Sequence, residues 1–332
     1  MLQRTLAVPL HRASLHGEPV LVQGPRGSGK TALVRREFPA HTFVSLEDSR
    51  DRTRARANPA AFWARLRGPA IVDGLHRAPE LMEHLPGERP LVLVSSRRLR
   101  LPYETFELYA PTLAEREGRP PLSLEMLGHF APPAAGRTLE PAPAERSWIY
   151  KDVREMIQVR DLDRFERFYE CALSSSGTVL DQQGLADESE VSHATAGRWL
   201  RALEDCFQVL RLPPSELDFG RRLVRSPKLH VLGSERVESR AVWEIYQNAR
   251  HQGVEPGLRY WRDSNGFEIQ MIVESEGAAP VPVSISAEPT PADLVRLHRW
   301  MQLAGVRRGA LISERMRLGL RGGVVGYSLG QL

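Results

Sequence analysis

The chain has 332 residues, of which 42% are hydrophobic and 26% charged, and its formal net charge is +4. This composition excludes fibrous and disordered chains and predicts a globular protein of two or three domains. The sequence has no apolar run of about 20 residues and no signal-peptide pattern, so we expect a cytoplasmic protein that does not bind a membrane.

Only two cysteines occur, Cys171 and Cys206, and their spacing excludes a disulfide framework and a zinc knuckle. Both fall at apolar-periodic positions and are expected to be buried thiols. The basic side of the charge balance is dominated by arginine, which is compatible with a nucleic-acid partner but does not require one.

Residues 1–130 alternate short apolar runs with helical segments, which predicts a mostly parallel α/β sheet. The expected strands are Pro19–Gln23, His41–Leu46, Ala70–Val72 and Leu91–Val94. The expected helices are Lys30–Phe38, Pro59–Leu66 and Pro79–Leu85.

The first strand leads into GPRGSGKT, which matches the phosphate-binding loop pattern in full. Glycines let backbone N–H groups converge on phosphate oxygens, and the N-terminus of the following helix adds partial positive charge. We therefore expect a nucleoside triphosphate with Mg²⁺. The residues expected to contact it are Gly24, Arg26, Gly27, Ser28, Gly29, Lys30 and Thr31.

Two further strand ends are expected to complete this site. Asp73 ends the strand Ala70–Val72 and is predicted to hold Mg²⁺ through water, together with the Thr31 hydroxyl. Ser95 follows another strand and is expected to sense the γ-phosphate. Hydrolysis also needs a group that orients the attacking water. The sequence does not identify that catalytic residue, and His76 and Glu80 are the candidates.

A proline- and alanine-rich segment, residues 131–145, is predicted to be a linker. The helices expected after it are Trp148–Gln158, Asp163–Ser174, Gln182–Asp187 and His193–Cys206. The last two helices and the turn between them predict a helix-turn-helix. Two further segments, Val209–Pro213 and Leu223–Val231, are expected to form its wing.

The second helix of this motif carries four candidate DNA contacts. His193, Thr195, Arg198 and Arg201 project away from its apolar stripe and are expected to face a groove of double-stranded DNA. Acidic residues surround the helix and argue against contact with phosphates, which leaves a purely structural winged helix as the alternative. The basic edge expected for the wing consists of Arg221, Arg222, Arg225 and Lys228.

The remaining residues again predict mixed α/β structure. The expected elements are helices at Val237–His251 and Pro291–Leu303 and strands at Leu258–Arg262, Glu268–Val273, Val281–Ser286 and Arg308–Ser313.

Together, GPRGSGKT, FVSLED and IVDGLHRAPEL resemble prokaryotic AAA-type ATPases that continue in a winged-helix segment and a restriction-endonuclease-like domain. Later segments, including VSHATAGRWLRALED and YWRDSNGFEIQMIVE, are similar in order and spacing. The resemblance implies ATP as the nucleotide. It also implies an AAA-like P-loop domain (residues 1–130), a linker (131–145), a winged-helix region (146–232) and a nuclease-like α/β domain (233–332).

The sequence departs from this family at two sites. The family has Asp-Glu where this chain has Asp73-Gly74, which implies weak or absent hydrolysis. The positions that match the family's acidic nuclease core are Glu244, Gln270, Ser284 and Ser286. A core with one carboxylate binds a hard cation poorly, so nuclease activity is not expected.

These features predict a nucleotide-dependent switch whose C-terminal half contacts DNA or a protein partner. Two alternatives stay open. One is a competent ATPase that acts on DNA, with His76, Glu80 or a partner supplying the missing group. The other is a DNA-binding regulator in which the nucleotide is structural. The resemblance to AAA-type proteins makes an oligomer possible without establishing one.

Overall fold

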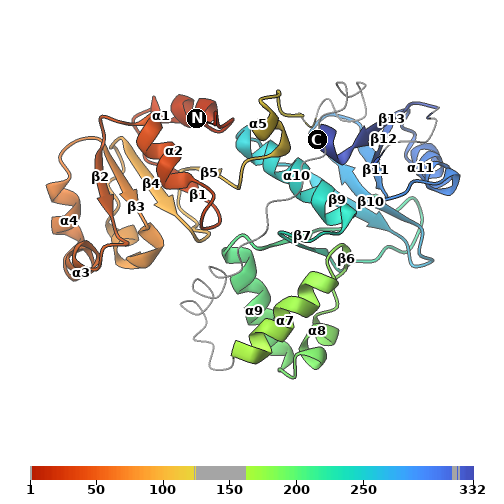
Figure 1. The fold of residues 1–332 in the computed structure, drawn as a ribbon, viewed down its shortest axis with the longest axis horizontal. Helices are drawn as coiled ribbons and strands as arrows, with labels where there is room; N and C mark the ends of the chain where they lie inside the picture. Colours follow the sequence, from red (N-terminus) through yellow and green to blue (C-terminus); the bar gives the residue numbers. More distant parts are fainter. Residues whose placement is uncertain (1, 123, 125–161, 316–319, 321) are drawn as a thin grey trace. The chain divides into compact units, whose positions relative to one another are not determined.

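The computed structural model describes residues 2–122, 124, 162–315, 320 and 322–332 (Figure 1). It forms two compact units, one made of residues 1–111 with the short segments 205–207 and 250–254, the other of the remainder. The first unit contains a five-stranded parallel sheet, which confirms the α/β class. The predicted linker and the helix expected at Trp148–Gln158 lie outside the described residues.

The sheet of the first unit has the strand order β2-β3-β4-β1-β5, with all neighbours parallel. Its strands are β1 (Val20–Gln23), β2 (Thr42–Ser45), β3 (Ala70–Asp73), β4 (Leu91–Ser95) and β5 (Glu104–Glu107). The carboxyl ends of parallel strands meet at one edge, so the segments that follow them gather there. In open α/β sheets this edge is where ligands bind.

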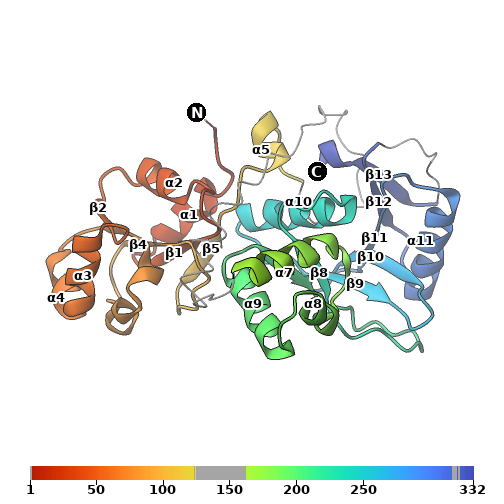
Figure 2. The same ribbon diagram turned by 60° about the horizontal axis from the view of Figure 1, so that its bottom comes forward.

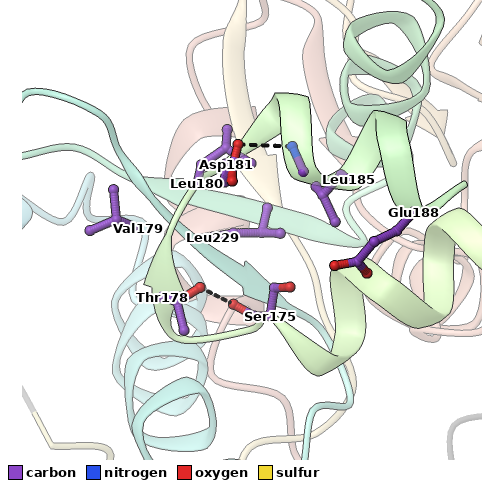
Figure 3. Close-up of a pocket in the computed structure, with 9 residues that line it drawn as sticks. Ser175, Thr178, Val179, Leu180, Asp181, Leu185, Glu188 and Leu229 are labelled. Carbon is purple, nitrogen blue, oxygen red and sulfur yellow. Dashed lines mark hydrogen bonds between the residues drawn. The ribbon is translucent and has the colours of Figure 1, made fainter. Parts of the chain in front are cut away.

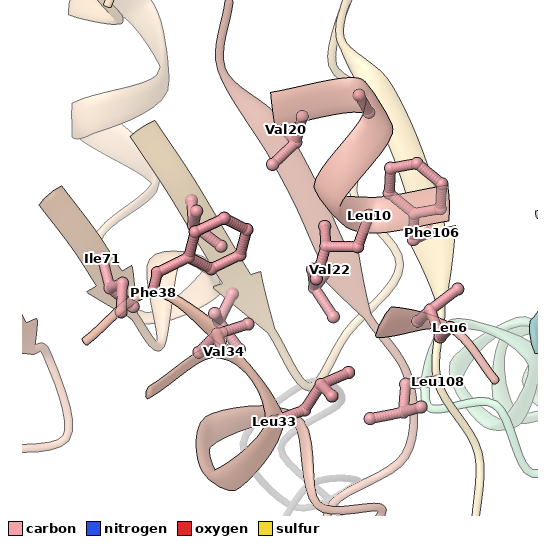
Figure 4. Close-up of a cluster of buried hydrophobic side chains, with 13 residues drawn as sticks. Leu6, Leu10, Val20, Val22, Leu33, Val34, Phe38, Ile71, Phe106 and Leu108 are labelled. Carbon is pink, nitrogen blue, oxygen red and sulfur yellow. The ribbon is translucent and has the colours of Figure 1, made fainter. Parts of the chain in front are cut away.

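One helix precedes β1, and further helices and two 3₁₀ segments lie between the strands. They are α1 (Ala7–Ser14), α2 (Lys30–Glu37), α3 (Ser49–Ala57), α4 (Pro59–Arg65), η1 (Leu75–Arg77) and η2 (Pro79–His84). Since residues alternate across a strand, the sheet buries two apolar faces. Figure 4 shows the first, a buried cluster that includes Val20 and Val22 of β1 and Leu33 and Val34 of α2. On the other face, Leu21 packs in the cluster formed with α3, α4 and the 3₁₀ segments.

The second unit begins with α5 (Leu113–Glu117) and then has a helical part with a small antiparallel sheet of order β6-β8-β7. Its elements are α7 (Leu162–Ser174), β6 (Thr178–Val179), α8 (Gln182–Glu188), α9 (His193–Asp205), β7 (Val209–Leu212) and β8 (Lys228–Val231). Trp199 of α9 meets Phe165 and Phe168 of α7 edge to face, with ring centroids 5.3 Å apart in each pair.

A mixed five-stranded sheet of order β13-β12-β11-β10-β9 follows. Its elements are α10 (Val237–His251), β9 (Leu258–Arg262), β10 (Glu268–Val273), β11 (Val281–Ile285), α11 (Pro291–Ala304), β12 (Gly309–Ser313), β13 (Val324–Ser328) and η3 (Leu329–Gln331). Helix α11 lies against this sheet (Figure 2). Its residues Leu297, Trp300 and Met301 belong to the buried cluster that also holds Ile269 and Ile272 of β10.

Most expected elements in the described residues are confirmed within a residue or two, but four points differ. The helix expected at Pro79–Leu85 is the short 3₁₀ segment η2. The strand expected at Leu223–Val231 is only Lys228–Val231, and Leu223 instead forms an isolated bridge with Asp263. Cys171 is partly exposed rather than buried. Several elements were not anticipated, namely α1, α3, α5, β5, β6, β13, η1 and η3.

Candidate functional site

The glycine-rich loop from Gly24 to Gly29 leaves β1 at the carboxyl edge of the sheet and enters α2 at Lys30. Gly24 has φ +150°, and a Cβ there would lie 2.0 Å from the carbonyl oxygen of Leu108. No side chain fits at that distance, so the close approach of two backbone segments requires glycine at this position. Gly27 and Gly29 also have positive φ.

Lys30 is the first residue of α2, and only 5% of it is exposed. Its ammonium donates to the carbonyl oxygens of Gly24 at 2.9 Å and Pro25 at 2.7 Å. The buried Ser28 hydroxyl lies 3.4 Å away. The loop therefore wraps around the lysine head group, and a buried positive charge stands beside the N-terminus of a helix.

Arg4 supports the loop from outside the predicted set of residues. Its guanidinium donates to the carbonyl oxygens of Ser28 at 2.9 Å and Tyr109 at 2.6 Å. Only 7% of Arg4 is exposed. No signal in the sequence indicates this role, because the arginine precedes the loop by some 20 residues and belongs to no recognisable motif.

Thr31 and Asp73, the two residues predicted to hold Mg²⁺, lie within hydrogen-bond distance of each other. The Thr31 hydroxyl donates to Oδ2 of Asp73 at 2.8 Å, although β4 lies between β1 and β3 in the sheet. Burial raises the pKa of Asp73 above its ordinary value, while the hydrogen bond from Thr31 and the charge of Lys30 oppose that rise. Among the described residues, no group of three His, Cys, Asp or Glu side chains could hold a metal.

His76 and Ser95 lie side by side at the same edge. The Nδ1 atom of His76 accepts from the backbone N–H of Ser96 at 3.3 Å, and the Ser95 hydroxyl lies 3.3 Å from it. That hydroxyl also donates to the carbonyl oxygen of Arg97 at 2.6 Å. Ser95 is fully buried, so a γ-phosphate contact would require its hydroxyl to leave these partners.

Four cations act on His76. Burial first, and then the positive charges of Arg97, Arg77, Arg26 and Lys30, together lower the pKa of His76 to about 3. His76 is therefore neutral at physiological pH and a weak base. The same four cations make this edge of the sheet favourable for a polyanion.

Two further carboxylates of the first unit, Glu80 and Glu47, differ in their setting. Glu80, a predicted catalytic candidate, lies on η2 and pairs with Arg56 at 2.8 Å. Glu47 lies two residues past the end of β2, and its Oε1 accepts from Arg77 at 2.6 Å and lies 3.9 Å from Arg26. Glu47 is not among the site residues predicted from the sequence. Its position directly after the predicted parallel strand His41–Leu46 is the signal that could have found it.

The four predicted DNA contacts lie along α9 in the second unit. His193, Arg198 and Arg201 are exposed and Thr195 is partly exposed. Two of the acidic groups expected to repel DNA are engaged by arginine. Glu190 pairs with Arg167 at 2.7 Å and Glu204 with Arg211.

The expected basic edge of the wing is only partly present. Arg222 and Arg225 are exposed. Arg221, in contrast, pairs with Asp263 at 2.6 Å. Lys228 is 1% exposed and bound to Glu238 and Glu268, so the expectation that it lies on the edge was wrong. Two carboxylates draw its ammonium inside.

The positions matched to a nuclease core hold structural roles. Glu244 on α10 accepts from the backbone N–H of Leu113, the first residue of α5, at 2.5 Å. Gln270 on β10 accepts from the N–H of Ile285 on β11 at 3.2 Å. Ser284 is buried and Ser286 partly exposed. The one carboxylate of this set thus caps a helix.

A small pocket opens between β6 and α8 (Figure 3). Thr178 donates to the carbonyl oxygen of Ser175 at 2.7 Å, and Asp181 caps α8 by accepting from the N–H of Gly184 at 2.9 Å. The pocket has a volume of ≈ 90 Å³, whereas a small-molecule site has roughly 300 Å³ or more. This pocket is too small to compete with the sheet edge as the functional site.

Comparison with known proteins identifies relatives but no activity. Residues 145–233 match a family described as a domain of unknown function (DUF8612). Uncharacterized proteins of Mycobacterium tuberculosis and Mycobacterium bovis are each 27% identical to this chain, over 88% of this chain and 76% of the relative. No solved structure matches the chain. Within the described part of the chain, no helix is both long and apolar enough to cross a membrane.

Proposed function

We propose that the first unit binds ATP with Mg²⁺ at the carboxyl edge of its parallel sheet and acts as a nucleotide-dependent switch. The observation that carries this proposal is the wrapping of the Gly24–Gly29 loop around the buried Lys30 ammonium, next to the Thr31–Asp73 hydrogen bond. A triphosphate would replace the carbonyl partners of Lys30 with phosphate oxygens. The four cations around His76 favour the same polyanion.

The donor set fits Mg²⁺. A threonine hydroxyl and an aspartate carboxylate are the hard oxygen donors that this ion takes alongside phosphate oxygens and water. The hydroxyl and the carboxylate already lie 2.8 Å apart. When bound, the ion would offset the charge of the β- and γ-phosphates. The chain's own contribution is to fix Thr31 at the start of α2 and Asp73 at the end of β3.

The experiment that tests this function is calorimetric titration of ATP, ADP and a non-hydrolysable ATP analogue in the presence of Mg²⁺. We expect Lys30→Ala to weaken ATP binding by roughly 100-fold, since charge-assisted hydrogen bonds contribute about 1.5–3 kcal/mol each. The matched control is Arg35→Ala, which removes one exposed positive charge from the same helix and should bind as the wild type does. Failure of the wild type to bind any of the three nucleotides would refute the proposal.

Helix α9 supports a second component, contact with double-stranded DNA. Its exposed face carries His193, Arg198 and Arg201, while its apolar face is buried against α7. The ion pairs of Glu190 and Glu204 reduce the repulsion that these carboxylates would exert on phosphates. The proposed switch would then act by changing how the second unit contacts DNA.

We expect the double substitution Arg198→Ala with Arg201→Ala to weaken DNA binding and to lower the slope of log affinity against log salt by roughly 2, one for each arginine that no longer neutralises a phosphate. Gel shifts over a range of salt concentrations measure both quantities. The control is Arg236→Ala with Arg315→Ala, which removes the same charge from two other exposed positions of the unit. Equal slopes for the two double variants would remove α9 as the recognition helix.

A further inference from the structure

Glu47 is held rigidly at the edge of the sheet where the candidate nucleotide site lies. The preceding residue, Leu46, donates its N–H to the carbonyl oxygen of Asp73 at 2.8 Å. Arg52 of α3 donates to the carbonyl oxygens of Leu46 at 3.0 Å and of Glu47 at 3.2 Å. Asp48 caps α3. The backbone of Glu47 is therefore fixed on both sides.

The Glu47 carboxylate lies next to the residue that lacks a side chain. A Cβ built on Gly74 would stand 3.7 Å from Oε1 of Glu47 and 3.6 Å from its backbone nitrogen. Gly74 itself has φ +82°, a conformation that disfavours any other residue. A glutamate side chain at position 74 would therefore begin beside the Glu47 carboxylate. Glu47 comes from the segment that follows β2, the strand next to β3.

Glu47 interacts with charged residues of two segments of the site, the glycine-rich loop and η1. Its Oε1 lies 3.9 Å from a guanidinium nitrogen of Arg26, which belongs to the glycine-rich loop, and accepts from Nε of Arg77 at 2.6 Å. Its charge also contributes to raising the pKa of Asp73. The side chain is 43% exposed, so water has access to the carboxylate.

We propose that Glu47 orients the water that hydrolyses the nucleotide, in place of the glutamate that Gly74 replaces. This inference rests on the proposed function. In the step, the water oxygen bonds to the γ-phosphorus while the bond from that phosphorus to the β–γ bridging oxygen breaks. ADP and inorganic phosphate form, and the water gives up a proton to solvent. Arg77 shares the carboxylate, so turnover is slow.

The other carboxylate and the histidine fit this role less well. Glu80 and Glu47 each pair with one arginine, Arg56 and Arg77 respectively, and of the two Glu47 also lies near Arg26 of the loop. His76 accepts from the Ser96 N–H through Nδ1, which places its proton on Nε2, and Nε2 is buried. A water that is to attack phosphorus needs an acceptor for its O–H, and of these three groups Glu47 offers one next to the loop.

The test compares Glu47→Gln with Glu80→Gln by two measurements made with Mg²⁺. The first is calorimetry of ADP alone and of ADP with aluminium fluoride, which mimics the phosphoryl group in the transition state. The second is single-turnover phosphate release from ATP. We expect Glu47→Gln to bind ADP with an affinity within about twofold of that of the wild type. Aluminium fluoride should increase the ADP affinity of the variant by a factor about 10-fold or more smaller than in the wild type. The variant should also release phosphate about 100-fold more slowly.

Glu80→Gln should match the wild type in both measurements. Arg77→Ala separates a water-orienting role from a structural ion pair. Arg77 is also one of the four cations at this edge, so its variant is measured under conditions in which all of the ATP is bound. Bound ATP should then release phosphate faster than in the wild type, whereas a purely structural pair predicts the same loss as Glu47→Gln. Normal aluminium fluoride affinity in Glu47→Gln, or no gain from aluminium fluoride in a wild type that binds ADP, would overturn the inference. A wild type that binds no nucleotide would instead refute the proposed function.

Discussion

Replacement of Lys228 by alanine is expected to lower the free energy of unfolding by about 3–5 kcal/mol, the cost of leaving a buried charge without its partner. The Lys228 ammonium donates to Glu238 at 2.6 Å and to Glu268, and it lies 5.6 Å from the centre of the Tyr260 ring. Only 1% of the side chain is exposed. Its removal leaves two carboxylates of the second unit without their shared cation.

Urea denaturation followed by tryptophan fluorescence measures this loss, since Trp261 and Trp300 are buried in the same unit. The control is Arg225→Ala, an exposed change nearby that should cost less than about 0.5 kcal/mol. Adding Glu238→Gln and Glu268→Gln to the alanine variant should restore part of the stability, because no unpaired charge then remains.

The pH dependence of the loss follows from the same carboxylates. Burial raises the pKa of Glu238 to about 7, although the neighbouring Lys228 ammonium favours the charged carboxylate and opposes that rise. Without the ammonium, Glu238 takes up a proton more readily, so the deficit of the variant should shrink as the pH falls from 8 to 5. A variant as stable as the wild type at pH 8 would show that Lys228 is not committed to the interior and would return it to the candidate DNA-binding edge.

Lys228 also illustrates what the sequence could not show. A lysine between basic neighbours and an apolar strand is expected on a surface, because an isolated lysine is rarely buried. The carboxylates that bury it come from α10 and β10, 10 and 40 residues further along the chain. Such pairings depend on tertiary contacts, which periodicity does not encode.

The parallel sheet is predictable because strands buried on both faces form continuous apolar runs bounded by turn residues. Strands β1, β3 and β4 are located this way, and β2, which is only partly buried, is located by the short apolar run at Phe43 and Val44. The fifth strand, β5, has the sequence Glu-Thr-Phe-Glu. It is not predicted because Phe106 is its one apolar residue. Helix α3, SRDRTRARA, escapes for a similar reason, since it is almost entirely polar and only Ala55 is buried.

The residues of the candidate nucleotide site likewise divide into those that the sequence predicts and those that it does not. The loop, Lys30, Thr31 and Asp73 are predictable because a local motif and a strand end place them, and the structure brings them together. Arg4 and Glu47 are not, because their roles come from neighbours that are distant in sequence, namely Tyr109 for Arg4 and Arg77 for Glu47. Sequence patterns thus locate the predicted phosphate contacts but not the residues that surround them.

Glu244 provides the second large expected effect, on the pH dependence of stability. Burial raises the pKa of its carboxyl to about 7, against an ordinary value of 4.5. Between these values the folded chain keeps a proton that the unfolded chain gives up. The free energy of unfolding should therefore fall as the pH rises through this window, by of the order of 3 kcal/mol for this group.

We expect Glu244→Gln to remove that slope, because a neutral amide can still accept the Leu113 N–H and has no proton to lose. The variant should match the wild type near pH 5 and exceed its stability near pH 8, measured by urea denaturation, while the exposed control Glu288→Gln should follow the wild type throughout. The result also tests whether Glu244 belongs to a metal site, as its match to the acidic core of the nuclease-like family would imply. A carboxylate that holds a metal would make the wild type, but not the variant, more stable in Mg²⁺ or Mn²⁺. Metal-dependent stabilisation together with DNA cleavage abolished in Glu244→Ala would contradict the capping role of Glu244 at the start of α5.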